Sequence, residues 1–186
     1  RRTLAAELAN NIGASVRAVG HARRAIELVG TRDPHRAAIL QVLLGEILYE
    51  TGGHEGGLAG LERALERAVE IVPADPPSPE RAYALGSLAG GRMVAGRHAE
   101  SLPLSEEALG LARQVGAREA EVRALTVRGN DLAYLGRAEE GLADLRHAMR
   151  LAEEIGDHWG LDRVYVNLTD ELTMLGRPGE SFRVAA

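Results

Sequence analysis

Apolar residues recur along most of this chain three or four positions apart, in runs that glycines interrupt at regular intervals. This period places the apolar side chains on one face of an α-helix. Two of the runs are close copies: LGRAEEGLADLRHAMRLAEEIG at 135–156 matches AGRHAESLPLSEEALGLARQVG at 95–116, and a third copy begins as LGRPGESFRVAA at 175–186. The pattern predicts helical hairpins repeated in tandem.

Each predicted hairpin consists of a first helix, a glycine turn and a second helix. First helices are expected near 2–12, 34–51, 79–95, 118–135 and 158–175, and second helices near 15–29, 54–72, 98–115, 138–155 and from 178 onward. The stretch PADPPSPE at 73–80 holds four of the seven prolines. Because proline interrupts a helix, we expect a loop there.

The five turn glycines set the register of the repeat. They are Gly13, Gly52, Gly96, Gly136 and Gly176, at spacings of 39, 44, 40 and 40 residues. A small residue stands seven positions before each of them: Ala6, Gly45, Ala89, Gly129 and Thr169. An apolar residue stands six positions after each: Val19, Leu58, Leu102, Leu142 and Phe182. The small residue would let the partner helix approach closely, and glycine suits the left-handed conformation that ends a helix.

Capping residues support the same boundaries. Asp33, Ser78 and Asp157 are typical helix N-caps, and two of them precede a proline at the first helical position. Gly30, Gly116 and Gly156 are typical stops at the end of a second helix.

The small residue, the glycine turn and the apolar residue at these offsets resemble the tetratricopeptide repeat, with a period nearer 40 than the usual 34. The resemblance covers essentially the whole chain and implies an all-α superhelix, a solenoid forming one repeat domain. Its five units would span approximately 1–30, 31–73, 78–116, 117–156 and 157–186, the last one truncated. The phrases NLTDELTMLGRPGES and RGNDLAYLGRAEEGL further resemble the repeat region of large ATP-dependent bacterial regulators of the LuxR type.

Composition narrows the possible functions. Hydrophobic residues make up 45% of the chain and aromatic residues only 3%, so the apolar content is mostly helix-forming Ala and Leu with Val and Ile. The net charge of −5 argues against a surface that follows nucleic-acid phosphates. No run of apolar residues is long enough for a membrane span. Because the chain begins with Arg1 rather than Met and ends inside a predicted helix, we expect a fragment of a larger cytoplasmic protein.

The chain offers little chemistry for catalysis. It has no cysteine, and all 22 of its basic residues are arginine, which excludes thiolate and Schiff-base chemistry and the lysine of a phosphate-binding loop. Its six histidines are dispersed: His21, His35, His54, His98, His147 and His158. Zinc needs three or four converging donors. We therefore expect no catalytic residue, no metal site and no cofactor, and a protein that is not an enzyme.

The resemblance implies that the first helices line a concave groove. The residues expected to face it and to contact a ligand are Tyr49, Tyr83, Arg123, Asn130, Tyr134, Arg163 and Asp170. Arg123 and Arg163 occupy the same offset in adjacent units, so they should meet at one side of the groove and favour a carboxylate-bearing ligand. The alternative is that they pair with nearby acids such as Glu119, Glu121 and Asp162. Trp159 is expected to pack against the preceding hairpin instead of facing the groove.

Two functions remain open. The first is a protein- or peptide-binding scaffold in the sensor or interaction segment of a bacterial transcriptional regulator. The second is a domain that binds a small-molecule effector and controls an ATPase elsewhere in the protein. In either case we expect no nucleic-acid contact from these residues, no membrane association, and contacts only between neighbouring units.

The last unit adds one more expectation. Its apolar residues Leu168, Leu172, Phe182 and Val184 would lack the neighbours that a following unit provides. Because an exposed apolar surface commonly finds a partner, the truncated unit could support self-association.

Overall fold

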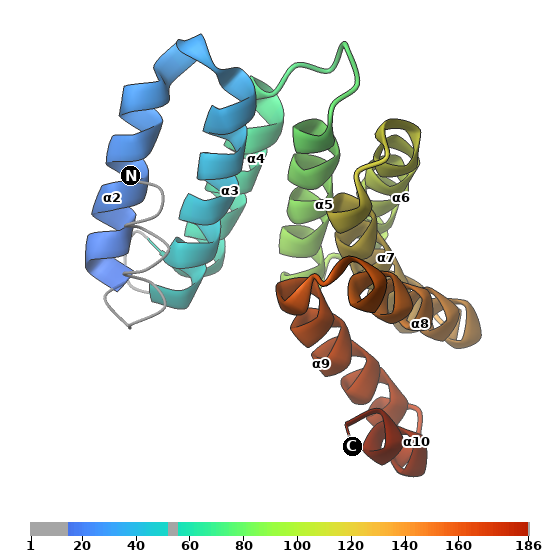
Figure 1. Ribbon diagram of the computed structural model, residues 1–186. Coiled ribbons are helices and arrows are strands. Elements are labelled where there is room, and N and C mark those ends of the chain that lie inside the picture. The colour runs from blue at the N-terminus through green and yellow to red at the C-terminus, as the bar shows by residue number, and fades with distance from the viewer. Residues whose placement is uncertain (1–14, 52–55, 186) are drawn as a thin grey trace.

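The computed structural model describes residues 15–51 and 56–185, and within these ranges the fold is entirely helical (Figure 1). The helices are α2 (Ser15–Val29), the short 3₁₀ helix η1 (Gly30–Arg32), α3 (Pro34–Thr51), α4 (Gly57–Ile71), α5 (Pro79–Val94), α6 (His98–Val115), α7 (Arg118–Tyr134), α8 (Ala138–Ile155), α9 (His158–Met174) and α10 (Pro178–Ala185). The prediction of an all-α fold is confirmed, and most predicted helix ends agree with the observed ones to within one residue. The helix predicted at 2–12, together with Gly13 and Gly52, lies outside the described residues.

The glycines that end the helices adopt the backbone conformation that their positions require. Gly96, Gly136 and Gly176 follow α5, α7 and α9 with φ angles of 72°, 86° and 71°. Gly116 and Gly156 end α6 and α8 in the same left-handed region. A side chain with a Cβ rarely adopts this conformation, so the repeating glycine is explained by backbone geometry.

The predicted N-caps form the expected hydrogen bonds. The backbone N–H of Arg81 donates to Oγ of Ser78 at 3.1 Å, and that of Gly160 donates to Oδ1 of Asp157 at 2.8 Å. Asp33 accepts from the N–H of Arg36 at 3.0 Å. The proline-rich segment between α4 and α5 is a loop, as predicted.

Small residues bring the two helices of a hairpin very close together. A Cβ added to Gly129 would lie 2.9 Å from the carbonyl oxygen of Gly141 and 2.8 Å from Cγ of Leu145. In the preceding hairpin, Ser101 donates from Oγ to the carbonyl oxygen of Ala89 at 2.8 Å. Backbones at this distance leave no room for a larger side chain, which explains why the position seven before the turn is small.

The hairpins stack so that first helices lie next to first helices. α3 packs on α5, α5 on α7 and α7 on α9, while α4, α6 and α8 each contact the first helices on both sides of them (Figure 1). The largest buried cluster lies at the junction of α5, α6, α7, α8 and α9, where Leu85, Leu125 and Val164 meet. The consecutive first helices therefore share one face of the solenoid.

The last hairpin departs from the expectation that its apolar residues would be uncovered. Leu168 and Leu172 are fully buried against Leu142 and Leu145, because α9 packs on α8. The exposed residue is Phe182, at 76%, whereas its counterpart Leu142 in the preceding unit is 0% exposed. The uncovered apolar surface of this hairpin therefore includes Phe182 on α10 and, on α9, Val166 and Met174.

No described helix combines the length and the apolar character that a bilayer crossing requires.

Substituting Gly141 by alanine should test the close helix approach. Its Cβ would lie against the carbonyl oxygen of Gly129 and 2.9 Å from the backbone nitrogen of Ala133, so the helices must separate. We expect a loss of about 1–3 kcal/mol in the free energy of unfolding, measured by urea denaturation.

The control is Gly110→Ala in the middle of α6, where an added Cβ meets nothing within 4 Å. This variant should gain about 0.5–1 kcal/mol, because alanine is the better helix former. Equal effects of the two substitutions would contradict the close approach at Gly141.

Candidate ligand-binding groove

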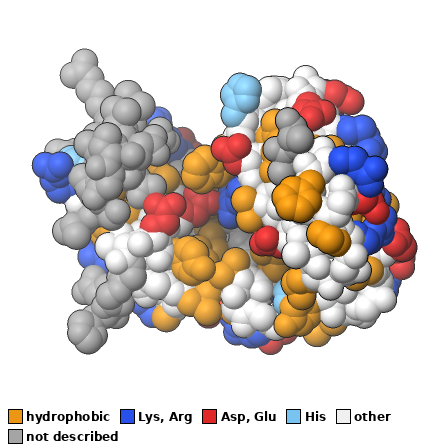
Figure 2. All heavy atoms as spheres, turned by 90° about the horizontal axis from the view of Figure 1, so that it is seen from below, with side chains coloured by type: hydrophobic (Ala, Val, Ile, Leu, Met, Phe, Trp, Pro, Cys, Tyr) orange, Lys and Arg blue, Asp and Glu red, His pale blue; other side chains and the backbone are white. Residues whose placement is uncertain are grey.

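A cavity of about 640 Å³ opens on the face that the first helices share. We call it the central cavity. Its walls come from α3, α5, α7 and α9, with part of α4, and its apolar and aromatic side chains include Tyr49, Met93, Val94, Trp159 and Val166. Viewed from below, hydrophobic side chains gather beside a recess between the two halves of the molecule (Figure 2). The cavity therefore combines an apolar wall with access from solvent.

Two arginines of the central cavity share a single carboxylate. Arg123 donates from Nη2 to Oε1 of Glu46 at 3.1 Å, and Arg163 donates from Nη1 to the same oxygen at 3.5 Å. Arg123 also donates to the hydroxyl oxygen of Tyr83 at 2.7 Å, and its guanidinium carbon lies 4.4 Å from the centre of that ring. Side chains from α3, α5, α7 and α9 thus meet at one point.

The surroundings of the two arginines shift their pKa values in opposite directions. The charge of Arg123, followed by burial, lowers the pKa of Arg163 from its usual value. Burial also disfavours the charged form of Arg123, but Tyr83 and Glu46 outweigh it and raise the pKa of Arg123. The side chain of Arg123 is only 11% exposed, so Glu46 is its required counter-charge.

This cluster corrects two sequence expectations. The arginines pair with Glu46, which lies three units before Arg163, whereas Glu121 accepts from Arg113 at 2.7 Å. The prediction that contacts join only neighbouring units is wrong at this point, because Glu46 and Arg163 are 117 residues apart. The solenoid curls enough to bring α3 and α9 across the groove from one another.

The structure places the expected groove residues in two groups. Tyr49, Tyr83, Arg123 and Arg163 line the central cavity. The other three, Asn130, Tyr134 and Asp170, are not part of its lining. Asn130 donates from Nδ2 to the carbonyl oxygen of Thr126 at 3.2 Å, one turn earlier in its own helix. These three residues lie further along α7 and α9, toward the ends of those helices.

The environment predicted for Trp159 from the sequence was wrong. It stands in the first turn of α9, is 59% exposed and lines the central cavity instead of packing against the preceding hairpin. The available signal was its place at the start of a first helix, the element that the resemblance puts on the concave face.

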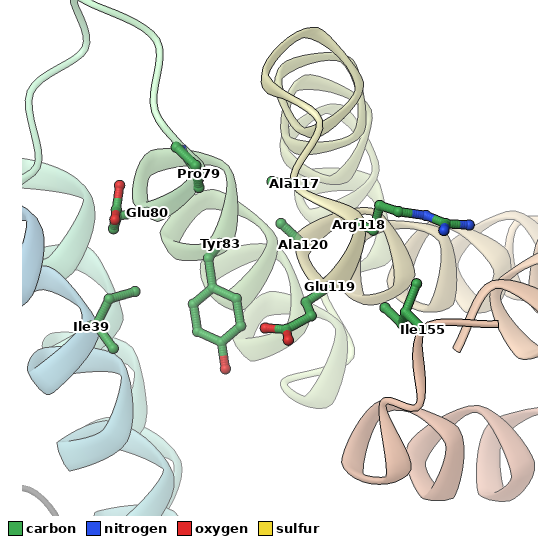
Figure 3. Close-up of a pocket in the computed structure, with 9 residues that line it drawn as sticks. All are labelled: Ile39, Pro79, Glu80, Tyr83, Ala117, Arg118, Glu119, Ala120 and Ile155. Carbon is green, nitrogen blue, oxygen red and sulfur yellow. The ribbon is translucent and has the colours of Figure 1, made fainter. Parts of the chain in front are cut away.

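A second hollow of about 570 Å³ adjoins the first, and we call it the upper hollow (Figure 3). Tyr83 and Glu119 line both hollows. Apolar side chains of α3, α7 and α8 form part of the wall of the upper hollow: Ile39, Ala120 and Ile155. The two hollows therefore share part of their walls, and we call them together the groove.

A separate polar cluster lies where α6, α7 and α9 meet. Nδ1 of His98 is 3.0 Å from Oδ1 of the buried Asp131, and Tyr134 stacks on the His98 ring with centroids 3.9 Å apart. Burial raises the pKa of Asp131 and that of Glu171 nearby. The charge of His98 partly opposes both shifts. This cluster accounts for the position of Tyr134, whose ring packs on His98.

The arrangement of helices and groove defines a tetratricopeptide-like α-solenoid. Among solved structures, a Rap protein complexed with competence and sporulation factor has a TM-score of 0.77 at 17% identity, over 98% of this chain and 50% of that chain. PlcR of Bacillus thuringiensis, in complex with the peptide PapR7 and DNA, has a TM-score of 0.72 at 12% identity, over 99% of this chain and 66% of that chain.

A third similar structure, the putative kinesin light chain of Podosopora anserina with nearly identical TPR-like repeats, has a TM-score of 0.66 at 16% identity, over 99% of this chain and 89% of that chain. The chain spans half the length of the Rap protein. Neither a protein-family model nor a curated protein matches the sequence. At these identities the likeness establishes the fold.

Replacing Glu46 by glutamine should destabilise the fold, because two guanidinium groups would then face each other without a carboxylate. We expect a loss of about 1–3 kcal/mol in the free energy of unfolding. Arg163→Gln should cost less or should stabilise, because the charge of Arg123 already opposes that of Arg163. Urea denaturation compares the two, with the exposed neighbour Glu50→Gln as control. An Arg163→Gln variant less stable than Glu46→Gln would contradict this account.

The buried Glu171 predicts a pH dependence of stability. Because burial raises its pKa in the folded state, the free energy of unfolding should fall as the pH rises from the ordinary value of 4.5 through the raised pKa. Glu171→Gln should therefore raise the melting temperature at neutral pH and change it little below 4.5. The exposed Glu153→Gln serves as control. A melting temperature lowered at neutral pH would show that the charged form of Glu171 is favourable.

Proposed function

We propose that the groove binds an extended peptide and that the protein acts without catalysis, as the ligand-sensing or interaction segment of a larger bacterial regulator. The observation that carries this proposal is the central cavity, where first helices of successive units present exposed aromatic and apolar side chains. Trp159 and Tyr49 are both exposed there. Large, partly exposed aromatic residues are the usual anchors of a binding interface.

The shape of the groove favours a peptide over a compact small molecule. The central cavity and the upper hollow lie side by side, share Tyr83 and Glu119 in their walls, and are both open to solvent. An extended chain can fill such a groove with alternate side chains. The volume of about 640 Å³ also lies within the range of small-molecule pockets, which keeps an effector-binding domain that controls an ATPase as the second candidate.

The comparisons support a regulatory role. PlcR, whose structure contains a peptide and DNA, shares this fold over 99% of the present chain. A regulator of the ATP-dependent LuxR type, which the repeat sequence resembles, would place this solenoid beside an ATPase and a DNA-binding domain. The proposal is that peptide binding in the groove alters the activity of those domains.

The single tryptophan provides the test. A randomised pool of acetylated and amidated heptapeptides would be passed over the immobilised protein, and retained peptides would be titrated while Trp159 emission is recorded. We expect the emission to shift to the blue, because a bound peptide removes the indole from water.

Trp159→Ala should weaken binding of the selected peptides by about tenfold or more, since loss of an aromatic anchor costs roughly 2 kcal/mol. Because this variant has no tryptophan, its affinity and that of the wild type are compared by isothermal titration calorimetry. The control is Phe182→Ala, which removes another exposed aromatic residue outside the groove and should leave affinity unchanged. Peptides that bind without affecting Trp159 would place their site elsewhere. A pool of small metabolites that shifts the emission when no peptide does would favour the second candidate.

A further inference from the structure

We propose that the upper hollow is a subsite for a lysine or arginine side chain of the bound peptide. This inference rests on the proposed function, because it assumes that a peptide occupies the adjoining central cavity. It goes further in naming the chemistry of one ligand residue and the carboxylates that select it.

The wall of the upper hollow suits the aliphatic part of such a side chain. Ile39, Ala120 and Ile155 form apolar surface on several sides (Figure 3), and Tyr83 lines both this hollow and the central cavity. Lysine and arginine bury their methylene groups on surfaces of this kind while the charged end stays near water. The upper hollow is open enough to leave that end hydrated.

The charges of the upper hollow favour a cation. Its carboxylates are Glu80 and Glu119, and its one guanidinium belongs to Arg118. Arg118 extends away from Tyr83 in Figure 3 and donates to Glu154 at 2.6 Å, so its charge is already neutralised. Glu80 lies 3.2 Å from Nδ1 of His35. Among the described residues, Glu119 forms no ion pair.

The same imbalance holds for the whole groove. Its lining contains six carboxylates and three guanidinium groups: Glu46, Glu50, Glu80, Glu119, Asp157 and Asp162 against Arg118, Arg123 and Arg163. Glu46 neutralises only one of the two arginines of the central cavity, so this cluster leaves one positive charge against the five remaining acids. The groove therefore presents a negative potential to an incoming ligand, and Glu119, shared by both hollows, lies at its middle.

The ion pairs of Arg123 and Arg163 change the ligand charge that the sequence predicted. Arg123 and Arg163 predicted a ligand with a carboxylate, on the assumption that their guanidinium groups face the groove unpaired. Both arginines instead donate to Glu46, and carboxylates outnumber guanidinium groups in the lining of the groove. A cationic side chain complements them.

The test compares two pools of acetylated, amidated heptapeptides, randomised except at one position that holds arginine in the first pool and its neutral isostere citrulline in the second. Both pools compete for the wild-type protein, and mass spectrometry gives the ratio of arginine to citrulline peptides retained. We expect enrichment of arginine by about tenfold, the effect of one charge-assisted hydrogen bond. The enrichment should decrease as salt concentration rises.

The Glu80→Gln/Glu119→Gln variant should bring the ratio close to one. The matched control is Glu107→Gln/Glu153→Gln, which makes the same change of charge on exposed positions of α6 and α8 and should keep the enrichment. Glu119→Gln alone alters an exposed side chain without an ion pair, so its reduced ratio can be measured in a folded protein. Circular dichroism checks that each variant remains helical.

The outcomes separate this inference from the proposed function. If both pools bind equally and both shift the emission of Trp159, the groove binds peptides but the cationic subsite is wrong. If arginine enrichment persists in the Glu80→Gln/Glu119→Gln variant, the cation is recognised elsewhere and the inference also fails. If neither pool is retained, the proposed function fails and the subsite fails with it.

Discussion

The close contact between the two helices of each hairpin is the constraint on which the rest of the structure depends. At Gly129 and Gly141 the backbones of α7 and α8 come so close that a Cβ on either glycine would meet main-chain atoms of the other helix, and this limits the angle and distance of the hairpin. In a solenoid a fixed rotation from one unit to the next sets the curvature of the whole array. The groove exists because this rotation keeps α3, α5, α7 and α9 on one face and brings the side chains of α3 and α9 within reach of each other.

Charge contributes to the groove at two depths, with different consequences. At the bottom, Glu46 and Arg123 are largely removed from water, where a missing partner would leave an uncompensated charge; these residues belong to the structure. At the rim, acids such as Glu119 and Asp162 are exposed, so each contributes little to stability while remaining available to a ligand. In the sequence, the charged residues at the two depths are of the same types and cannot be told apart. Only their exposure separates the charges that hold the groove together from those that can recognise something.

The sequence predicted the helices well because local rules decide them. Turn glycines, N-caps such as Ser78 and Asp157 and the spacing of apolar residues all act within a few positions, so most helix ends were found to within a residue. The meeting of Glu46 with Arg163 depends instead on the rotation summed over three unit junctions, which no local pattern specifies. Trp159 was missed for a related reason: a tryptophan in the first turn of a helix faces the groove or the preceding hairpin according to a small change in that rotation. Four of the seven residues expected in the groove line its cavity, and the other three extend beyond it along the same helices.

The hydrogen bonds of Glu46 also bear on how the array unfolds. In a stack whose units contact only their neighbours, the ends can fray one unit at a time, and cooperativity decays along the chain. A carboxylate in the second unit that holds arginines of the fourth and fifth closes the stack into a loop of interactions, so that loosening α3 also weakens the hold on α9. The middle of the solenoid is thereby coupled to its end through the groove as well as along the helices. A ligand in the groove would contact the hydrogen bonds of Glu46 and would thereby affect both the middle and the end of the solenoid.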